Sequence, residues 1–408
     1  MKETSEHARM AASRLHPATA RSPIYSSVGQ RMKILIDVSP LRGISPELGA
    51  TGVGRWIEGA VGALGDLAPE WELHLLDTAP DPSSDHQLLK GPNHVHHSVS
   101  VPGPVRRLRG WSTSPRLARA LPRIDAVLGT TFVPWRLPGA RSIPVIYDLS
   151  YIHAAKTGRL GQMVFLRAAM RSVVKRASAI VTISEAVKHE IVDQYGVSDQ
   201  DVFVAYPGIT GEPPGSVDDD LDLPSAYLLF VGTIEPRKNL SLLLETIAAL
   251  RADGIALPPL VVAGGRGWRS SRDETLLRRS EKEHGTRVLG YVTRSSLPSL
   301  YRGAAMLVFP SLYEGFGMPP LEAMFYGCPV VASHRPSIAE VVGDAGMLVS
   351  PDDRSALGDA IVQTLTDPGR RADMIERGYR RARFFTWERC GETLMAAIEH
   401  RARPQVGQ

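Results

Sequence analysis

Short runs of apolar residues recur along the chain, each bounded by polar residues, glycine or proline. Runs of this length without polar alternation are typical of strands in a parallel sheet that is covered on both faces. In the first half of the chain they predict strands at 33–38, 72–77, 126–128, 143–147, 179–183 and 202–206. In the second half they predict strands at 227–231, 259–263, 287–290, 306–310 and 329–332.

Helical patterns lie between many of these strands. They predict helices at 58–67, 160–177, from Glu185 onward, at 240–252 and at 319–327, and an amphipathic helix at 386–400. Ser184 can cap the helix that starts at Glu185, and Asn239 can cap the helix that follows it. Strands that alternate with helices predict an α/β fold, with parallel sheets covered by helices on both faces.

The segment 211–224, GEPPGSVDDDLDLP, has the composition of a linker. It predicts a domain of residues 32–211, a second domain of residues 212–385, and a final segment of residues 386–408. Residues 1–31 are rich in Ala, Ser and Arg and have no usable periodicity. We interpret them as a disordered arm, or as sequence upstream of a start at Met32.

The composition limits the classes of protein that need to be considered. The chain has 408 residues, 43% of them hydrophobic, which is ample for two buried cores. No apolar stretch approaches 18 residues, so we expect no membrane span. The two cysteines, Cys328 and Cys390, provide no disulfide framework and fit a reducing, cytoplasmic compartment.

The positive charge is concentrated in one block. Residues 86–184 hold 15 basic and two acidic residues, a balance of +13 in a chain of net charge +4. Such a block predicts contact with a polyanion or an anionic lipid surface. Within it, Arg167, Arg171 and Lys175 share one helix face, which could equally be an ordinary solvated face.

The most informative stretch is 309–332, FPSLYEGFGMPPLEAMFYGCPVVA. A strand leads into a glycine-punctuated loop, and prolines follow where a helix would begin. Glu314 lies in the loop and Glu322 in the first helical turn. The N–H groups of Phe316, Gly317 and Met318 predict an anion site at the helix N-terminus. An anion site beside two carboxylates suits a nucleotide-sugar, because its phosphates would bind the N–H groups and its hydroxyls would donate to the carboxylates.

The ends of the other strands of this half carry further candidates. Ligands of doubly wound sheets bind beyond the carboxyl ends of the strands. The strand that ends at 231 is followed by GTIEPRKN, which would bring the cations Arg237 and Lys238 into the same crevice. The remaining candidates that line this edge are Gly232, Gly265 and Val292.

The segments EGFGMPPLEAM, GTIEPRKN and GGRGW together resemble the retaining glycosyltransferases of family 4, from about Met32 to the C-terminus. The resemblance implies the GT-B fold, in which two Rossmann-like, doubly wound domains face a central cleft. It also implies that the last helix crosses back to the first domain. The amino-acid sequences of these motifs are most similar to those of the mannosyltransferase-type branch of the family.

The resemblance also implies residue roles. Arg237 and Lys238 would neutralise the donor diphosphate, Glu322 would hold the ribose, and Glu314 would contact the donor sugar or the phosphates. In the first domain Tyr147-Asp148 stands where the family often has His-Asp. The segment TGVGR, with Gly52 and Gly54, resembles the acceptor-side loop of the family.

The resemblance implies retention of the anomeric configuration without an enzyme nucleophile. Two cations and a helix N-terminus could stabilise a leaving nucleoside diphosphate without a metal, so we expect no metal or other cofactor. His94, His96 and His97 lack a fourth ligand and regular spacing, which favours a non-metal role.

The function predicted on this basis is transfer of a hexose, mannose from GDP-mannose, to a glycan or to a lipid-pyrophosphate-linked acceptor in cell-surface polysaccharide or glycolipid synthesis. We expect a cytoplasmic protein, peripheral at the inner face of the plasma membrane, without a nucleic-acid partner. A UDP- or dTDP-sugar donor is an alternative. Alternatives of other classes are an NAD-dependent oxidoreductase, because Asp77 ends the strand after Gly52-x-Gly54, and a catalytically silent binding protein.

Overall fold

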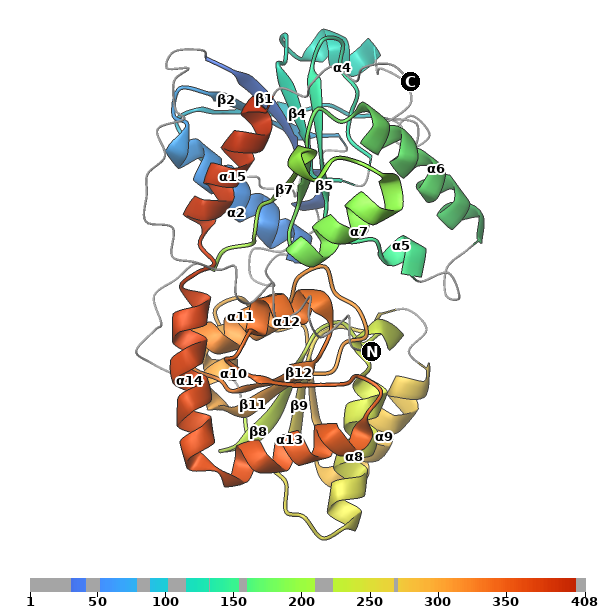
Figure 1. Ribbon diagram of the computed structural model, residues 1–408, viewed down its shortest axis with the longest axis vertical. Helices are drawn as coiled ribbons and strands as arrows, with labels where there is room; N and C mark the ends of the chain where they lie inside the picture. The colour runs from blue at the N-terminus through green and yellow to red at the C-terminus, as the bar shows by residue number, and fades with distance from the viewer. Residues whose placement is uncertain are drawn as a thin grey trace. The chain divides into compact units, whose positions relative to one another are not determined.

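The computed structural model describes residues 31–41, 52–78, 89–101, 115–131, 133–153, 160–209, 223–267 and 271–400. They form two compact units, each built on its own parallel sheet with helices on both faces (Figure 1). One unit holds the described residues up to Gly208 and those from Thr386 onward, and the other begins at Ile209 and ends at Phe385. The predicted arm up to residue 30 and the predicted boundary at 211 lie outside the described residues.

The first unit contains a seven-stranded sheet in the order β3-β2-β1-β4-β5-β6-β7, and all of its strand pairs are parallel. Its strands are β1 (Lys33–Asp37), β2 (Glu72–Asp77), β3 (His94–Ser98), β4 (Ala126–Gly129), β5 (Arg141–Ile146), β6 (Ile180–Thr182) and β7 (Val202–Val204). The sequence did not predict β3, because this edge strand has the polar sequence HVHHS and is largely exposed.

The helices of the first unit are α2 (Gly52–Leu67), α4 (Pro115–Ala120), α5 (Ser150–His153), α6 (Leu160–Arg176), α7 (Glu185–Tyr195) and α15 (Trp387–Glu399). The Ser184 side chain accepts from the backbone N–H of Val187, so the predicted cap of α7 is confirmed. The predicted start of α2 at residue 58 is wrong, because this helix already begins at Gly52.

The second unit contains a six-stranded parallel sheet in the order β10-β9-β8-β11-β12-β13. Its strands are β8 (Tyr227–Val231), β9 (Leu260–Ala263), β10 (Arg287–Gly290), β11 (Ala304–Phe309), β12 (Val330–Ser333) and β13 (Met347–Val349). The helices are α8 (Leu240–Ala252), α9 (Ser271–His284), α10 (Leu297–Gly303), α11 (Met318–Phe325), α12 (Pro336–Val342), α13 (Arg354–Thr366) and α14 (Pro368–Ala382).

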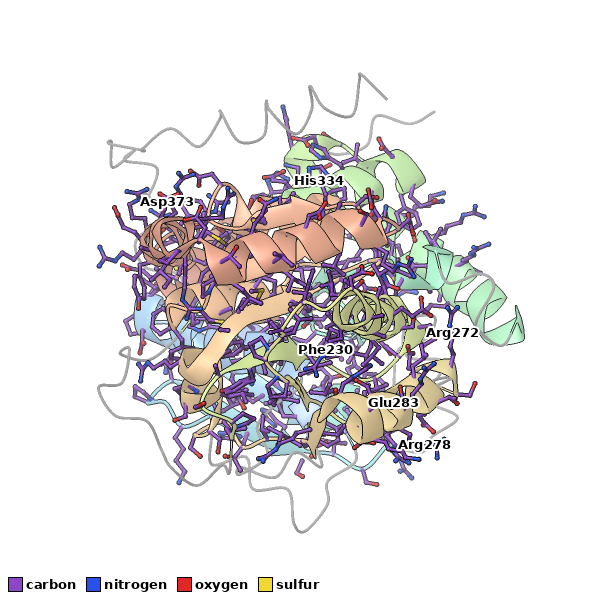
Figure 2. All side chains as sticks on the ribbon, turned by 90° about the horizontal axis from the view of Figure 1, so that it is seen from below. Phe230, Arg272, Arg278, Glu283, His334 and Asp373 are labelled. Carbon is purple, nitrogen blue, oxygen red and sulfur yellow. The ribbon has the colours of Figure 1, made fainter. Side chains whose placement is uncertain are left out.

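The core of the second unit explains its predicted strands. Fully buried residues of β8, β9 and β11 pack against α8 and α13, as Leu228, Met306 and Ile361 do. Figure 2 shows Phe230 in the interior, whereas Arg272, Arg278 and Glu283 lie on the outer side of α9. Helix α9 is too polar to carry an apolar periodicity, so the sequence did not predict it.

Both sheets follow the doubly wound strand order, which confirms the predicted fold class. In this order the chain direction across the sheet reverses once, between β1 and β4 in the first unit and between β8 and β11 in the second. In doubly wound folds this point, at the carboxyl edge of the sheet, is where ligands bind. Among the described residues, no helix has the length and apolar character needed to cross a membrane.

The last helix, α15, packs on α2 within the first unit. Contact is close because Gly59 lies under the indole ring of Trp387: a Cβ at residue 59 would come within 2.2 Å of that ring. Gly208 is equally close, since a Cβ there would lie 2.3 Å from the backbone nitrogen of Trp387. Glycine at residue 59 therefore permits this helix pair to form.

We expect Gly59→Ala to lower the free energy of unfolding by about 1–3 kcal/mol, because the added methyl group overpacks a filled interface. Gly62→Ala on the same helix is the matched control, since a Cβ there meets nothing within 4 Å. It should be neutral or stabilise by up to about 1 kcal/mol through helix propensity. Urea unfolding of both variants measures the difference, and equal effects would contradict this account of the α2–α15 contact.

Candidate active site

The candidate site lies at the carboxyl edge of the second sheet, where β8 and β11 are neighbours. The chain leaves β8 at Val231 and β11 at Phe309, and the loops after these two strands carry the predicted cations and the predicted loop carboxylate. The strand order reverses between these two strands, so the fold opens a crevice at this point. The two motifs are distant in sequence but adjacent in space.

Arg237 belongs to a 3-10 turn, Pro236–Lys238, that follows β8. Its Nη1 donates to Glu314 Oε2 at 2.8 Å and to the carbonyl oxygen of Tyr313 at 2.8 Å. Its Nε and Nη2 both donate to Glu235 Oε1, at 3.0 and 2.7 Å. Two carboxylates and a carbonyl thus fix the orientation of the guanidinium group.

Lys238 binds the same carboxylate from the other side. Its Nζ donates to Glu314 Oε1 at 2.6 Å and lies 5.3 Å from the centre of the Phe309 ring. The aliphatic part of the side chain lies over Gly232, where a Cβ would stand 3.5 Å from Lys238 Cε. An ammonium group has three N–H donors, and the described residues take one of them by hydrogen bond.

The cluster formed by Glu235, Arg237, Lys238 and Glu314 balances two positive against two negative charges. It is largely shielded from solvent, because the side chains of Glu314 and Lys238 are 10% and 12% exposed and that of Arg237 is 29% exposed. Burial alone would raise the pKa of Glu314, but the charges of Lys238 and Arg237 and the hydrogen bond from Lys238 outweigh it and hold that pKa below its usual value.

Asn239 anchors the turn that carries the two cations. It has the left-handed backbone conformation, with a φ of 57°, and it stands directly before α8. The prediction that its side chain caps α8 is wrong: the amide nitrogen donates to the carbonyl oxygens of Pro310 and Pro351, at 3.1 and 3.0 Å. Asn239 thereby ties the loop after β8 to the loop after β11.

The predicted anion site at the start of α11 has few backbone N–H groups that could bind a ligand. Helix α11 begins at Met318, and Gly317 before it has a φ of 138°, which favours glycine. Pro319 and Pro320 have no N–H group, and the N–H of Leu321 donates to Gly317 O at 3.2 Å. The N–H groups that could bind a ligand here are therefore those of Gly317 and Met318, just before the prolines. The buried ring of the neighbouring Phe316 packs edge-on against Phe385.

Glu322 lies in the second turn of α11, one turn later than predicted, because the helix starts at Met318 and a turn takes 3.6 residues. It is 7% exposed, and its Oε2 accepts from the hydroxyl of Tyr301 at 2.7 Å. Tyr301 lies on α10 and is fully buried, so the carboxylate has a fixed position.

The loops after β8, β9 and β10 approach one another at backbone level. A Cβ at Gly264, whose φ is 150°, would come within 2.0 Å of the carbonyl oxygen of Gly232. A Cβ at Gly265 would meet the ring of Tyr291, which precedes Val292 and is 66% exposed. Glycine is therefore required at residue 264 for the strand ends to come together at this edge, whereas a side chain at residue 265 would displace the exposed ring of Tyr291.

The candidates in the first unit follow β5. The Oδ1 of Asp148 accepts from the N–H of Ser150 at 3.0 Å, as a residue at the start of a helical turn does. The ring of Tyr147 packs edge-on against Trp56 on α2, and its hydroxyl is buried without a hydrogen-bond partner among the described residues. Burial, the Cys390 thiol and Asp37 raise the pKa of Tyr147, so this hydroxyl stays protonated.

Gly52 and Gly54 do not form the loop that the sequence predicted. Both lie in the first turn of α2, neither has a positive φ, and Gly54 is buried. Close packing requires glycine later on this helix, at Gly59, where a Cβ would meet the ring of Trp387. Thr51, which opens the TGVGR segment, lies outside the described residues.

The histidines of β3 contact the neighbouring strand β2 and the segment before β3. His97 Nε2 lies 2.8 Å from Nδ1 of His74, and the rings of His94 and His96 both reach the carbonyl oxygen of Leu89. In the described part of the chain, no group of three or more His, Cys, Asp or Glu residues has the arrangement of a metal site.

Sequence reasoning missed two members of the site. Glu235 was not predicted because an acidic residue two positions before an arginine is common on any surface turn. Its proximity to Arg237 in the sequence was visible, but the donation of both Nε and Nη2 of Arg237 to its Oε1 was not. The role of Asn239 was likewise hidden, because its two acceptors, Pro310 and Pro351, are 71 and 112 positions away.

Comparison with known proteins covers both units. The family model described as "Glycosyltransferase Family 4" matches residues 51–212, and that described as "Glycosyl transferases group 1" matches residues 218–381. The chain is 33% identical over 267 residues to the O-antigen chain mannosyltransferase B of Escherichia coli, a match that covers 64% of this chain and 70% of that protein.

A second relative is the serotype-specific mannosyltransferase WbdA of Escherichia coli, 28% identical over 282 residues. That match covers 65% of this chain but only 33% of the relative, so the chain spans about a third of that protein. Among solved structures, sucrose-phosphate synthase of Thermosynechococcus elongatus aligns with a TM-score of 0.72 at 19% identity, over 90% of this chain and 98% of that one. This likeness shows the GT-B fold.

The lowered pKa of the buried Glu314 carboxylate predicts how the stability of the protein depends on pH. Because the pKa of Glu314 is lowered in the folded state, the unfolded chain takes up the proton first as pH falls below the ordinary value of 4.5. The stability that Glu314 contributes is therefore present above that pH and is lost as pH falls towards the lowered pKa. Glu314→Gln should melt below wild type at pH 7, at a cost of about 2 kcal/mol, and the gap should narrow towards pH 3.

Melting temperatures measured by calorimetry between pH 3 and pH 7 test this. Glu283→Gln is the matched control, because Glu283 pairs with Arg279 on the exposed side of α9. The control should stay close to wild type at every pH. A gap for Glu314→Gln that does not change with pH would mean that its charge is not what stabilises the cluster.

Proposed function

Because the chain belongs to family 4 of the glycosyltransferases, we propose that it transfers mannose from GDP-mannose, with retention, to a glycan or lipid-linked acceptor of cell-surface polysaccharide. The chain is a glycosyltransferase of the GT-B type. The observation that carries the finer proposal is the cluster at the β8–β11 edge, together with relatives that are named O-antigen and serotype-specific mannosyltransferases.

In this proposal Lys238 is the principal ligand of the donor diphosphate. Its ammonium group gives one N–H to Glu314 and has two further donors, whereas Arg237 is already held by two carboxylates and a carbonyl. Arg237 then acts mainly as the group that fixes Glu314. A diphosphate that enters the crevice adds negative charge to a balanced cluster, which favours the ammonium group moving towards the phosphate.

In this proposal, transfer depends on stabilisation of the leaving nucleoside diphosphate. A nucleoside diphosphate that departs from the sugar gains charge, and a fixed cation with backbone N–H groups before α11 stabilises that charge in a partly dry site. We propose front-face attack, in which the departing phosphate takes the acceptor proton, so that no residue of the chain forms a bond to the sugar. Glu322, held by Tyr301, would accept from the ribose hydroxyls.

The acceptor is proposed from the relatives and from charge. Proteins named for O-antigen chains suggest a saccharide acceptor, and the basic block 86–184 suggests that it is carried at an anionic membrane surface on the cytoplasmic side. Arg167, Arg171 and Lys175 are exposed along α6, as a surface contact requires. In the first unit, Asp148 is the residue that we propose to bind the acceptor or the sugar.

A UDP- or dTDP-linked donor is the alternative within the same reaction, because the base is selected by pocket shape. The oxidoreductase alternative has lost its basis. Both family models and both relatives are glycosyltransferases, and fourteen positions, 38–51, separate β1 from α2 where a dinucleotide site needs a tight turn.

We expect GDP and GDP-mannose to raise the melting temperature by about 5 °C at saturating concentration, because they bind only the folded state. UDP and dTDP should have little effect. Lys238→Ala should abolish the shift, and Arg237→Ala should abolish it too, because Glu314 loses its position. Lys282→Ala, which removes an exposed cation of α9, is the matched control and should shift like wild type.

A shift with UDP and not with GDP would overturn the mannose donor and leave the family unaffected. Incubation of GDP-mannose with acceptor then tests the reaction itself. The anomeric configuration of the product, measured by proton NMR, should match that of the donor, and an inverted product would contradict front-face attack.

Transfer is predicted to need no metal ion, because the cations of the chain balance the leaving diphosphate. Activity should therefore change less than about twofold when EDTA is added to protein freed of metals, since charge stabilisation comes from Lys238 and the backbone. A loss of an order of magnitude that Mg²⁺ or Mn²⁺ restores would contradict this prediction.

A further inference from the structure

A second cluster of cations lines a cavity in the first unit. The cavity measures about 380 Å³, within the size range of small-ligand sites. Three arginines and two serines line it beside the ring of Trp135; they are Arg136, Arg141, Arg176, Ser142 and Ser178.

The cavity lies towards the opposite edge of its sheet from the candidate acceptor residues. Arg141 and Ser142 open β5, and Arg176 and Ser178 stand just before β6. The strands are parallel, so both pairs lie near the amino ends, whereas Tyr147 and Asp148 follow the carboxyl end of β5. A ligand here would occupy a different place from a sugar bound beside Asp148.

The charge of the cavity is not balanced by its own walls. Among the described residues that line it, none is acidic. Arg141 donates to the carbonyl oxygen of His400 at 3.4 Å, a neutral partner, and Arg136 has no hydrogen bond or ion pair with a described residue. In the site of the second unit, by contrast, each cation meets a carboxylate.

The arginines also affect one another. Arg136 and Arg176 line the same cavity. Burial lowers the pKa of Arg176, and the positive charge of Arg136 lowers it further. The C-terminal end of α6 explains a cation at Arg176, because the last turn of a helix favours positive charge. It does not explain Arg136 and Arg141, which come from the β4–β5 loop and from β5.

We propose that this cavity binds a phosphate-bearing group. Guanidinium groups bind phosphate oxygens through two parallel hydrogen bonds, and the serine hydroxyls can donate to the same oxygens. The volume leaves room for an organic part beside the phosphate. The same chemistry is offered by a soluble phosphomonoester and by the headgroup of an anionic lipid, and the experiment separates these two sources.

The test measures binding of glycerol phosphate, with chloride buffer of equal ionic strength as the reference, and co-sedimentation with phosphatidylcholine vesicles that contain phosphatidic acid. Arg136→Gln with Arg176→Gln should weaken binding of one or both probes at least about tenfold, because each lost charge-assisted hydrogen bond is a strong one. Lys282→Ala is the control: it removes an exposed cation of the second unit that does not line the cavity.

The donor site is a second place where phosphate could bind, so Arg237→Ala with Lys238→Ala is measured in parallel. Binding in the cavity should survive in that variant and be lost in the Arg136/Arg176 variant. Loss with glycerol phosphate identifies a soluble ligand, and loss with vesicles alone identifies a lipid headgroup.

The proposal is overturned if neither probe binds wild type, if the Arg136/Arg176 variant binds like wild type, or if Lys282→Ala weakens binding equally. An unchanged melting temperature in chloride buffer shows that the variants fold. If the double variant does not fold, Arg136→Gln alone decides the question, because Arg136 is exposed at the rim and makes no described contact that folding needs.

Discussion

The carboxylate of Glu314, held between Lys238 and Arg237, is the interaction on which the candidate active site depends. It joins the loop after β11 to the turn after β8, and Asn239 adds a second link between the same loops. A carboxylate this deeply buried would be costly without the two cations, and the cations would repel each other without it. The cluster therefore stabilises the unit and at the same time fixes the positions of the candidate site residues.

The doubly wound strand order makes that interaction possible. β8 and β11 are neighbours in the sheet although Arg237 and Glu314 are 77 positions apart in the chain. Glycine at residue 264 allows the loops after β8 and β9 to approach at backbone distance. The charged candidate residues thus gather at one edge of the sheet, where the strand order reverses.

The two units use positive charge differently. In the site of the second unit, Arg237 and Lys238 are both paired with carboxylates. The cavity of the first unit is lined by three arginines and, among the described residues, by no acidic side chain. Arginines that line one cavity repel one another, and a bound anion would reduce that repulsion.

The amino-acid sequence alone settles the buried strands, the cap by Ser184, and which chemical groups follow each strand, because these depend on patterns within a few residues. It also contains the motifs from which the family could be recognised. The sequence did not predict polar elements such as β3 and α9, because their residues show no hydrophobic periodicity. Only the tertiary structure decides that Glu235 fixes Arg237, that Asn239 binds two distant carbonyls in place of capping a helix, and that Gly52 lies within a helix. Each of these depends on partners or backbone angles that are set by strand pairing and packing across the whole unit, and no local pattern encodes them.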